Sequence, residues 1–236
     1  MSNLDEIMRR LRESGTMLGV QRWDYSKSMS TMDFLAEVYG VGKFRTESFD
    51  IDKNIRFAYE NIARWFLGDK EMLCLNPANK LVEKGDLRKG LYIAGRTGCG
   101  KSWAMEIFGF LAQEHRLKVN LGNKELLLTP TRWRADAITA FYMRTGELAP
   151  FIDTPVMLID DLGTEPAEVV YMGNRVDVVR HILERRADDS SKLTLLTSNI
   201  PMNAPVLGER YGDRVVSRLR QMCNYLEMSG NDKRLG

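Results

Sequence analysis

Residues that build disulfide frameworks and zinc sites are scarce in this sequence. Its 236 residues include three cysteines and two histidines. The cysteines, Cys74, Cys99 and Cys223, are odd in number and widely spaced, and no two of them form a C-x-x-C pair. A disulfide scaffold and a structural zinc site are therefore not predicted, and this cysteine usage is typical of a reducing compartment.

Long apolar runs and a charge excess of one sign are also lacking. No apolar run is long enough to span a membrane, and the first residues carry acids and arginines where a secretory leader has its apolar core. We therefore expect a cytoplasmic protein with no membrane partner. Lys and Arg number 34 against 32 Asp and Glu, a net charge of +2, so any contact with nucleic acid requires a local basic surface. With 44% hydrophobic residues, the chain can form one packed domain and a modest appendage.

One segment has the pattern of a phosphate-binding loop. Residues 95–102 read GRTGCGKS, follow the apolar run Leu91–Ala94 and open a helix-forming segment. In such a loop the glycines let successive backbone N–H groups face the β-phosphate, Lys101 reaches the β- and γ-phosphates, and the Ser102 hydroxyl binds Mg²⁺. We predict that the chain binds a nucleoside triphosphate with Mg²⁺. The predicted phosphate-binding residues are Gly95, Arg96, Thr97, Gly98, Cys99, Gly100, Lys101 and Ser102. Cys99 is either a small residue that fits the loop or an alkylatable thiol that bound ATP would protect.

A pair of acids lies at the end of a predicted buried strand. The apolar run 156–159 is followed by Asp160 and Asp161. We expect Asp160 to hold the metal together with Ser102, and Asp161 to orient or deprotonate the attacking water. Two acids after an apolar run would also fit a simple strand-to-loop exit. The phosphate-binding loop about 60 residues upstream favours the interpretation as a metal site.

Helical and strand patterns alternate along the chain after residue 50. We predict helices over 2–14, 32–39, 51–68, 101–115, 132–144 and 176–186, and strands over 91–94, 117–121, 126–129, 156–159 and 193–197. Such alternation predicts an α/β domain over 51–236, with a parallel sheet and helices on both faces. Residues 1–50 form a small helical segment that either binds a partner or packs on the main domain.

Two further groups of residues are candidates for the site or its partners. Strand 193–197 ends at Ser198 and Asn199, and the Asn199 amide can bond a γ-phosphate or the lytic water, although the pattern alone would equally fit a turn. In the segment 209–220, Arg214 and Arg218 share a helix face, as solvated surface charge or as an edge offered to a neighbouring subunit's nucleotide.

A basic and aromatic mixture marks the segment 132–144. Arg132, Arg134 and Arg144 flank the aromatic residues Trp133, Phe141 and Tyr142 there. They either hold single-stranded nucleic acid or form a helix with an aromatic core face and a solvated basic face.

In this order the motifs resemble those of the AAA+ ATPases of the DnaC and DnaI helicase-loader branch, to which the transposase helper IstB is related. The matching segments are GRTGCGKS at 95–102, VMLIDDLG at 156–163, GTEPAEVVYMGN at 163–174, TLLTSN at 194–199, YGDRVVSRLRQM at 211–222 and GNDKR at 230–234. The resemblance implies a P-loop AAA+ (ASCE) fold of three αβα layers, with strand 193–197 between the strands of the phosphate-binding loop and of the acids. It also implies ATP as the nucleotide and self-association through the AAA+ interface.

The resemblance assigns roles to single residues. It implies that Lys101, Asp161 and Asn199 (sensor 1) are catalytic, that Arg234 is sensor 2, and that Arg218 is an arginine finger with Arg214 as the alternative. Asp161 stands where a glutamate is usual, which leaves Glu165 as a second candidate for the catalytic base.

The function that the resemblance implies is ATP-dependent loading of a replicative DnaB-type helicase onto single-stranded DNA, with slow, assembly-dependent hydrolysis. Residues 1–50 would grip the helicase. The alternative is an IstB-like transposase helper ATPase that acts on double-stranded DNA.

Overall fold

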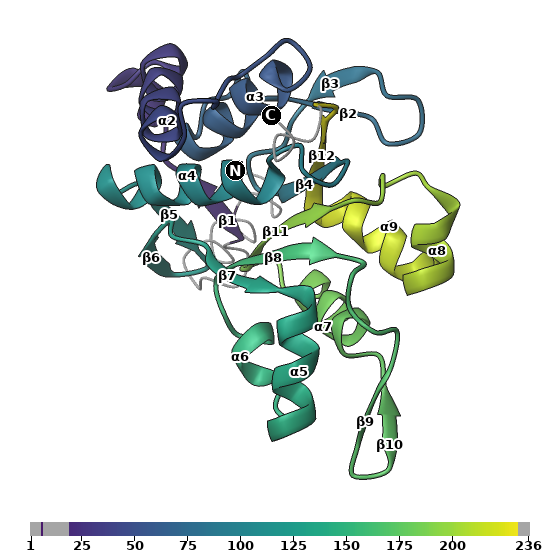
Figure 1. Ribbon diagram of the computed structural model, residues 1–236. Coiled ribbons are helices and arrows are strands. Elements are labelled where there is room, and N and C mark those ends of the chain that lie inside the picture. Colours follow the sequence, from purple (N-terminus) through teal and green to yellow (C-terminus); the bar gives the residue numbers. More distant parts are fainter. Residues whose placement is uncertain (1–5, 7–18, 231–236) are drawn as a thin grey trace.

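A seven-stranded mixed sheet forms the centre of the molecule. The computed structural model in Figure 1 describes residue 6 and residues 19–230. Five strands are parallel, in the order β12 (Cys223–Met228), β4 (Gly90–Gly95), β11 (Leu193–Ser198), β8 (Val156–Leu162) and β7 (Thr131–Arg134). The short strands β2 (Leu73–Leu75) and β3 (Val82–Lys84) extend the β12 edge in antiparallel pairing. The predicted α/β class is confirmed, and β11 lies between β4 and β8 as expected.

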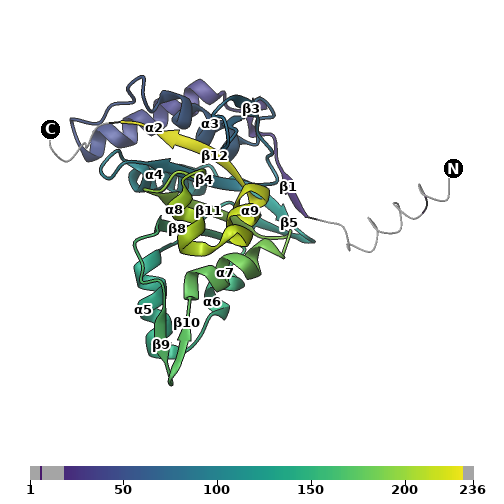
Figure 2. The ribbon, with the colours of Figure 1, turned by 90° about the vertical axis from the view of Figure 1, so that its right-hand side faces the viewer.

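Helices cover both faces of this sheet, as Figures 1 and 2 show. Alternate residues of β4 point to opposite faces, because successive side chains of a strand alternate. Leu91 and Ile93 join one core cluster with α3 (Arg56–Leu67) and α4 (Lys101–Glu114). Tyr92 and Ala94 join the other, which includes residues of α5 (Ala135–Thr145), α7 (Val178–Ala187) and α9 (Asp213–Met222). The sheet thus separates two hydrophobic cores, which gives the three layers.

Helix α2 (Thr31–Arg45) is longer than predicted. It begins where expected, with the Ser30 hydroxyl accepting from the Asp33 N–H, but it runs through Gly40, where we predicted its end. Burial of Phe34 and Val38 against α4 outweighs the low helix propensity of glycine. The predicted helix over 2–14 lies outside the described residues.

The segment after residue 130 differs from its prediction. We expected one helix over 132–144, but residues 131–134 form strand β7 and helix α5 begins at Ala135. Within the strand, Trp133 packs on Phe151, with ring centroids 5.1 Å apart. Its neighbours Arg132 and Arg134 point to the opposite face of the strand and contact Asp160 and Asp161 of β8. The period of two, with tryptophan and arginine alternating, is therefore that of a strand.

Other elements refine the predicted pattern. Strands β5 (Lys118–Leu121) and β6 (Lys124–Leu127) pair antiparallel with each other, and β1 (Val20–Arg22) joins them in a separate three-stranded sheet, so this part does not continue the predicted βα alternation. The predicted helix over 51–68 begins only at Arg56. The segment 209–220 is broken at Gly212 into α8 (Pro205–Tyr211) and α9. A hairpin of β9 (Val169–Tyr171) and β10 (Asn174–Val176) and the short helices η1 (Tyr25–Lys27) and α6 (Ala149–Ile152) complete the described chain. No helix in the described part is both long and apolar enough to cross a membrane.

Candidate functional site

The loop between β4 and α4 has the backbone that phosphate binding requires. Gly98 and Gly100 adopt left-handed conformations, with φ of 81° and 94°, which residues with a side chain rarely adopt. Helix α4 begins directly after this turn, so its first N–H groups and its dipole face the loop.

Lys101 is buried in this turn. Its ammonium group donates to the Gly95 carbonyl at 2.7 Å, to the Arg96 carbonyl at 3.0 Å and to Asn199 Oδ1 at 2.8 Å. The structure thus brings two predicted catalytic residues, Lys101 and Asn199, into contact.

The two predicted metal ligands are also in contact. Asp160, at the carboxyl end of β8, is fully buried and accepts a hydrogen bond from the Ser102 hydroxyl at 2.8 Å. One carboxylate and one hydroxyl are the hard oxygen donors that Mg²⁺ takes from a protein when phosphates and water supply its other ligands. Among the described residues no cluster of three or more His, Cys, Asp or Glu offers a more complete site. The donor set therefore fits Mg²⁺ bound with a nucleotide.

Thr197 links the two acids and was not predicted as a site residue. Its hydroxyl donates to Asp160 Oδ1 at 2.5 Å and accepts from the backbone N–H of Asp161 at 2.9 Å. Thr197 is fully buried in β11, where an apolar residue would be usual. The strand also contains Thr194 and Ser198, so the sequence offered no signal that set Thr197 apart.

Asp161 has a backbone conformation that explains the residue type. Its φ is +57°, in the left-handed region, where aspartate and asparagine are enriched and longer side chains are disfavoured. The glutamate usual at this position would sit there at a greater conformational cost. The Asp161 side chain lines the cavity, and Arg134 Nη1 lies 3.5 Å from its Oδ2.

The carboxylate of Glu165, the second candidate for the base, is held by hydrogen bonds from neighbouring residues. It is buried and accepts hydrogen bonds from Arg210 Nη2 and the Gly163 N–H, each at 2.9 Å, and from the Tyr211 hydroxyl. Burial and the charge of Glu165 raise the pKa of Tyr211, so this hydroxyl stays protonated and donates. Asp161 lines the cavity and Glu165 does not, so which of them is the base stays a prediction that the cavity lining favours for Asp161.

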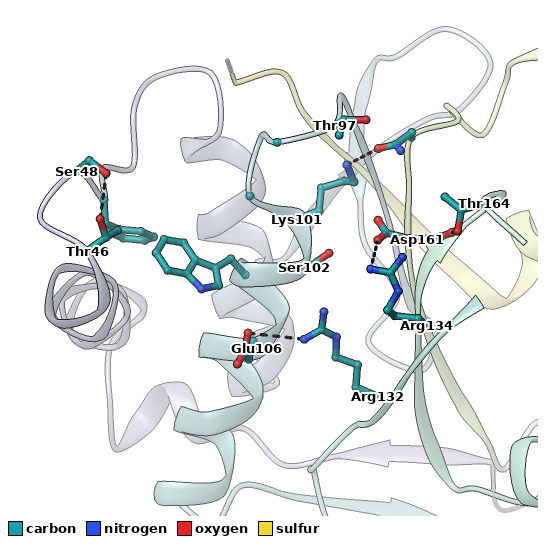
Figure 3. Close-up of a pocket in the computed structure, with 15 residues that line it drawn as sticks. Thr46, Ser48, Thr97, Lys101, Ser102, Glu106, Arg132, Arg134, Asp161 and Thr164 are labelled. Atoms are coloured by element: carbon teal, nitrogen blue, oxygen red, sulfur yellow. Dashed lines mark hydrogen bonds and ion pairs between the residues drawn. The ribbon is translucent and has the colours of Figure 1, made fainter. Parts of the chain in front are cut away.

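A cavity of about 700 Å³ opens beside these groups (Figure 3). Thr46 and Ser48, which follow α2, lie across it from Asp161 and Thr164. The residues that line it are Thr46, Ser48, Phe49, Thr97, Gly98, Gly100, Lys101, Ser102, Trp103, Glu106, Arg132, Arg134, Asp161, Thr164 and Asn199. Its volume and the position of the phosphate-binding loop suit a mononucleotide.

Arg132 and Arg134 belong to this cavity. We predicted that they either hold single-stranded nucleic acid or lie on the solvated face of a helix. The helix is wrong, because both residues lie on strand β7, and nucleic-acid binding stays a prediction. Arg132 pairs with Asp160 and Glu106, and Arg134 pairs with Asp136 and Asp161. Glu106 also pairs with Arg45, the last residue of α2, at 3.2 Å. The sequence pattern detected a basic group but not that strand β7 directs it toward the acids.

Cys99 does not face the cavity. Its side chain is fully buried in the core cluster that contains Ile55 and Met228. This burial favours the alternative that Cys99 is a small residue that fits behind the loop, and ATP-protected alkylation stays a prediction.

The arginine-finger candidates lie on α9, away from the cavity lining. Arg214 is exposed, whereas Arg218 pairs with Asp188 at 3.2 Å and donates to Gln221 at 3.1 Å. Neither lines the cavity of its own chain, so a role at a neighbour's nucleotide stays a prediction. Arg234 lies outside the described residues.

Comparisons with known proteins identify relatives by fold. No protein-family model matches the chain, and no curated protein matches its sequence. A crystal structure of the DnaC helicase loader has a TM-score of 0.50 and 20% sequence identity, over 78% of this chain and 95% of that one. A protein described as a candidate primosome component, from Streptococcus pyogenes serotype M3, has a TM-score of 0.50 and 18% identity, over 80% of this chain and 87% of that one. The expected resemblance to DnaC-type AAA+ proteins is thus confirmed at the level of the fold.

Proposed function

We propose that this chain is an Mg-ATP-dependent ATPase that loads a hexameric replicative helicase onto single-stranded DNA. The observation that carries the ATPase part is the convergence of Lys101, Ser102, Asp160 and Asn199 beside one cavity, at the carboxyl ends of neighbouring parallel strands. The helicase-loader part is supported by the fold shared with the DnaC helicase loader.

The chain's own residues provide binding, orientation and proton transfer. The N–H groups of residues 97–102 and the Lys101 ammonium would hold the β- and γ-phosphates. Ser102 and Asp160 would hold Mg²⁺, which when bound neutralises phosphate charge. Asn199, in hydrogen-bond contact with Lys101, would orient the γ-phosphate, and Asp161 would accept the proton of the attacking water.

Assembly would complete the site. We place Arg214 or Arg218 of one copy at the nucleotide of the next, where a trans arginine contributes about 10³ to 10⁵ in turnover. Hydrolysis by the isolated chain would then be slow, and ATP would act mainly by ordering the contact between copies.

Helix α2 is the longest described element of the segment 1–50, which we expect to bind the helicase. Its exposed side presents Met32, Tyr39 and Phe44, the last with 94% of its surface exposed. Its other side packs on α3 and α4, so a truncation at residue 50 would remove part of the core. The helicase contact is therefore tested by substitution in the full chain.

A pull-down from a lysate of the source cells tests the proposal. The tagged full chain, with Mg-ATP, is compared with Lys101→Ala and with the double variant M32S/Y39S, and V206S, which also removes an exposed apolar side chain, is the matched control. We expect the wild-type chain and V206S to recover a hexameric helicase, identified by mass, and the other two variants to lose it. Recovery of a transposase without a helicase would refute the loader and favour the transposase helper.

A further inference from the structure

The Asp160 carboxylate, which we propose to hold the metal ion, is paired with the Arg132 guanidinium. Arg132 donates to Asp160 Oδ2 through Nε at 3.0 Å and through Nη2 at 2.5 Å. The Ser102 and Thr197 hydroxyls both donate to the other oxygen, Oδ1. Asp160 is fully buried, whereas 38% of the Arg132 side chain is exposed.

This arrangement makes Arg132 and a metal ion competitors. A buried carboxylate requires a compensating charge, and here the guanidinium supplies it. With Oδ1 engaged by two hydroxyls, Oδ2 is the oxygen that a second cation would approach, and Arg132 occupies it. A metal ion bound to the same carboxylate and the Arg132 guanidinium would repel each other.

A second carboxylate lies within reach of Arg132. Its Nη1 is 3.7 Å from Glu106 Oε2, and Glu106 lines the same cavity. Figure 3 shows Arg132 and Glu106 joined in this way, with Arg132 below Ser102. Arg132 can therefore leave Asp160 and remain paired within the cavity.

We propose that Arg132 is a resident counter-cation of Asp160 that sets the metal affinity of the site. It pairs with Asp160 while no metal is bound and with Glu106 once a metal has bound. This inference rests on the proposed nucleotide site. A role of Arg132 in holding phosphate predicts the opposite sign for its removal, so the two roles are separable.

The test is a Mn²⁺ titration of the full chain saturated with ADP, followed by electron paramagnetic resonance. We expect Arg132→Gln to bind Mn²⁺ about three- to tenfold more tightly than the wild type, because the competing charge is gone. Glu106→Gln removes the alternative partner, so it should weaken Mn²⁺ binding by about twofold or more. Arg175→Gln has the same change in net charge but lies in the β9–β10 hairpin, where it pairs with Glu168 outside the cavity lining, and its Mn²⁺ affinity should stay within about twofold of the wild type.

The outcomes separate this inference from the proposed function. Unchanged or weaker Mn²⁺ binding by Arg132→Gln, with ADP binding intact and a wild-type melting temperature, would overturn the role of Arg132. Weaker ADP binding by this variant in EDTA would assign the residue to phosphate. A wild-type chain that binds no ADP would instead refute the nucleotide site itself.

Discussion

Replacing Thr197 by valine should destabilise the protein although the two side chains have nearly the same shape. The change removes the hydroxyl that donates to Asp160 at 2.5 Å and accepts from the Asp161 N–H at 2.9 Å. A hydrogen bond to a charged group contributes about 1.5 to 3 kcal/mol and a neutral one about 0.5 to 1.5 kcal/mol. Asp160 keeps Ser102 and Arg132, so it is not left unpaired. We expect the free energy of unfolding to fall by about 2 to 4 kcal/mol.

Urea unfolding of the full chain, without nucleotide and in EDTA, measures this difference. The matched control is Thr197→Ser, which keeps the hydroxyl and loses one methyl group, at a cost of about 0.8 kcal/mol. If the valine variant is as stable as the serine variant, the hydroxyl does not hold the two acids together, and the reasoning for Thr197 fails.

Three further predictions concern the packing of the chain. A Cβ at Gly42 would lie 2.3 Å from the buried Phe49 ring, so G42A should lose about 1 to 3 kcal/mol of stability in thermal unfolding. A Cβ at Gly40 would meet no atom within 4 Å, so G40A should gain about 0.5 to 1 kcal/mol, and equal effects of the two variants would refute this packing. The buried Arg186 side chain donates to four backbone carbonyls and to the Thr194 hydroxyl. Arg186→Met should therefore lower the free energy of unfolding, measured in urea, by about 3 to 5 kcal/mol, and a decrease below about 1 kcal/mol would contradict this prediction. All three cysteines are buried, and burial raises the pKa of Cys74 to about 11 and that of Cys223 to about 12. A thiol reagent should therefore label the native chain slowly, with or without ATP, and the unfolded chain fully. Fast labelling that ATP blocks would show that Cys99 is exposed.

The elements that carry the proposed nucleotide site were predictable because their patterns are local. The glycines of residues 95–100 fix the turn between β4 and α4, and the buried run before Asp160 fixes the strand that carries it. The position of β11 beside β4 came from the resemblance, since strand order depends on contacts between distant segments.

The remaining site residues depend on pairing that the sequence does not display. The four residues of β7 are too few to separate a strand from a helix by periodicity, and pairing with β8 decides the outcome. The same pairing brings Arg132 to Asp160. Strand β12 was not predicted, although it completes the parallel sheet beside β4.

A carboxylate that two cations share offers a route by which binding at one part of the chain affects binding at another. Glu106 pairs with Arg45 at the end of α2 and with Arg132 beside the acids, so its balance between them connects the cavity with the helix. If a protein that binds α2 shifts this balance, it changes the affinity of the cavity for its ligand by a given factor. By linkage, the ligand changes the affinity of α2 for that protein by the same factor, which measurements of either affinity can determine.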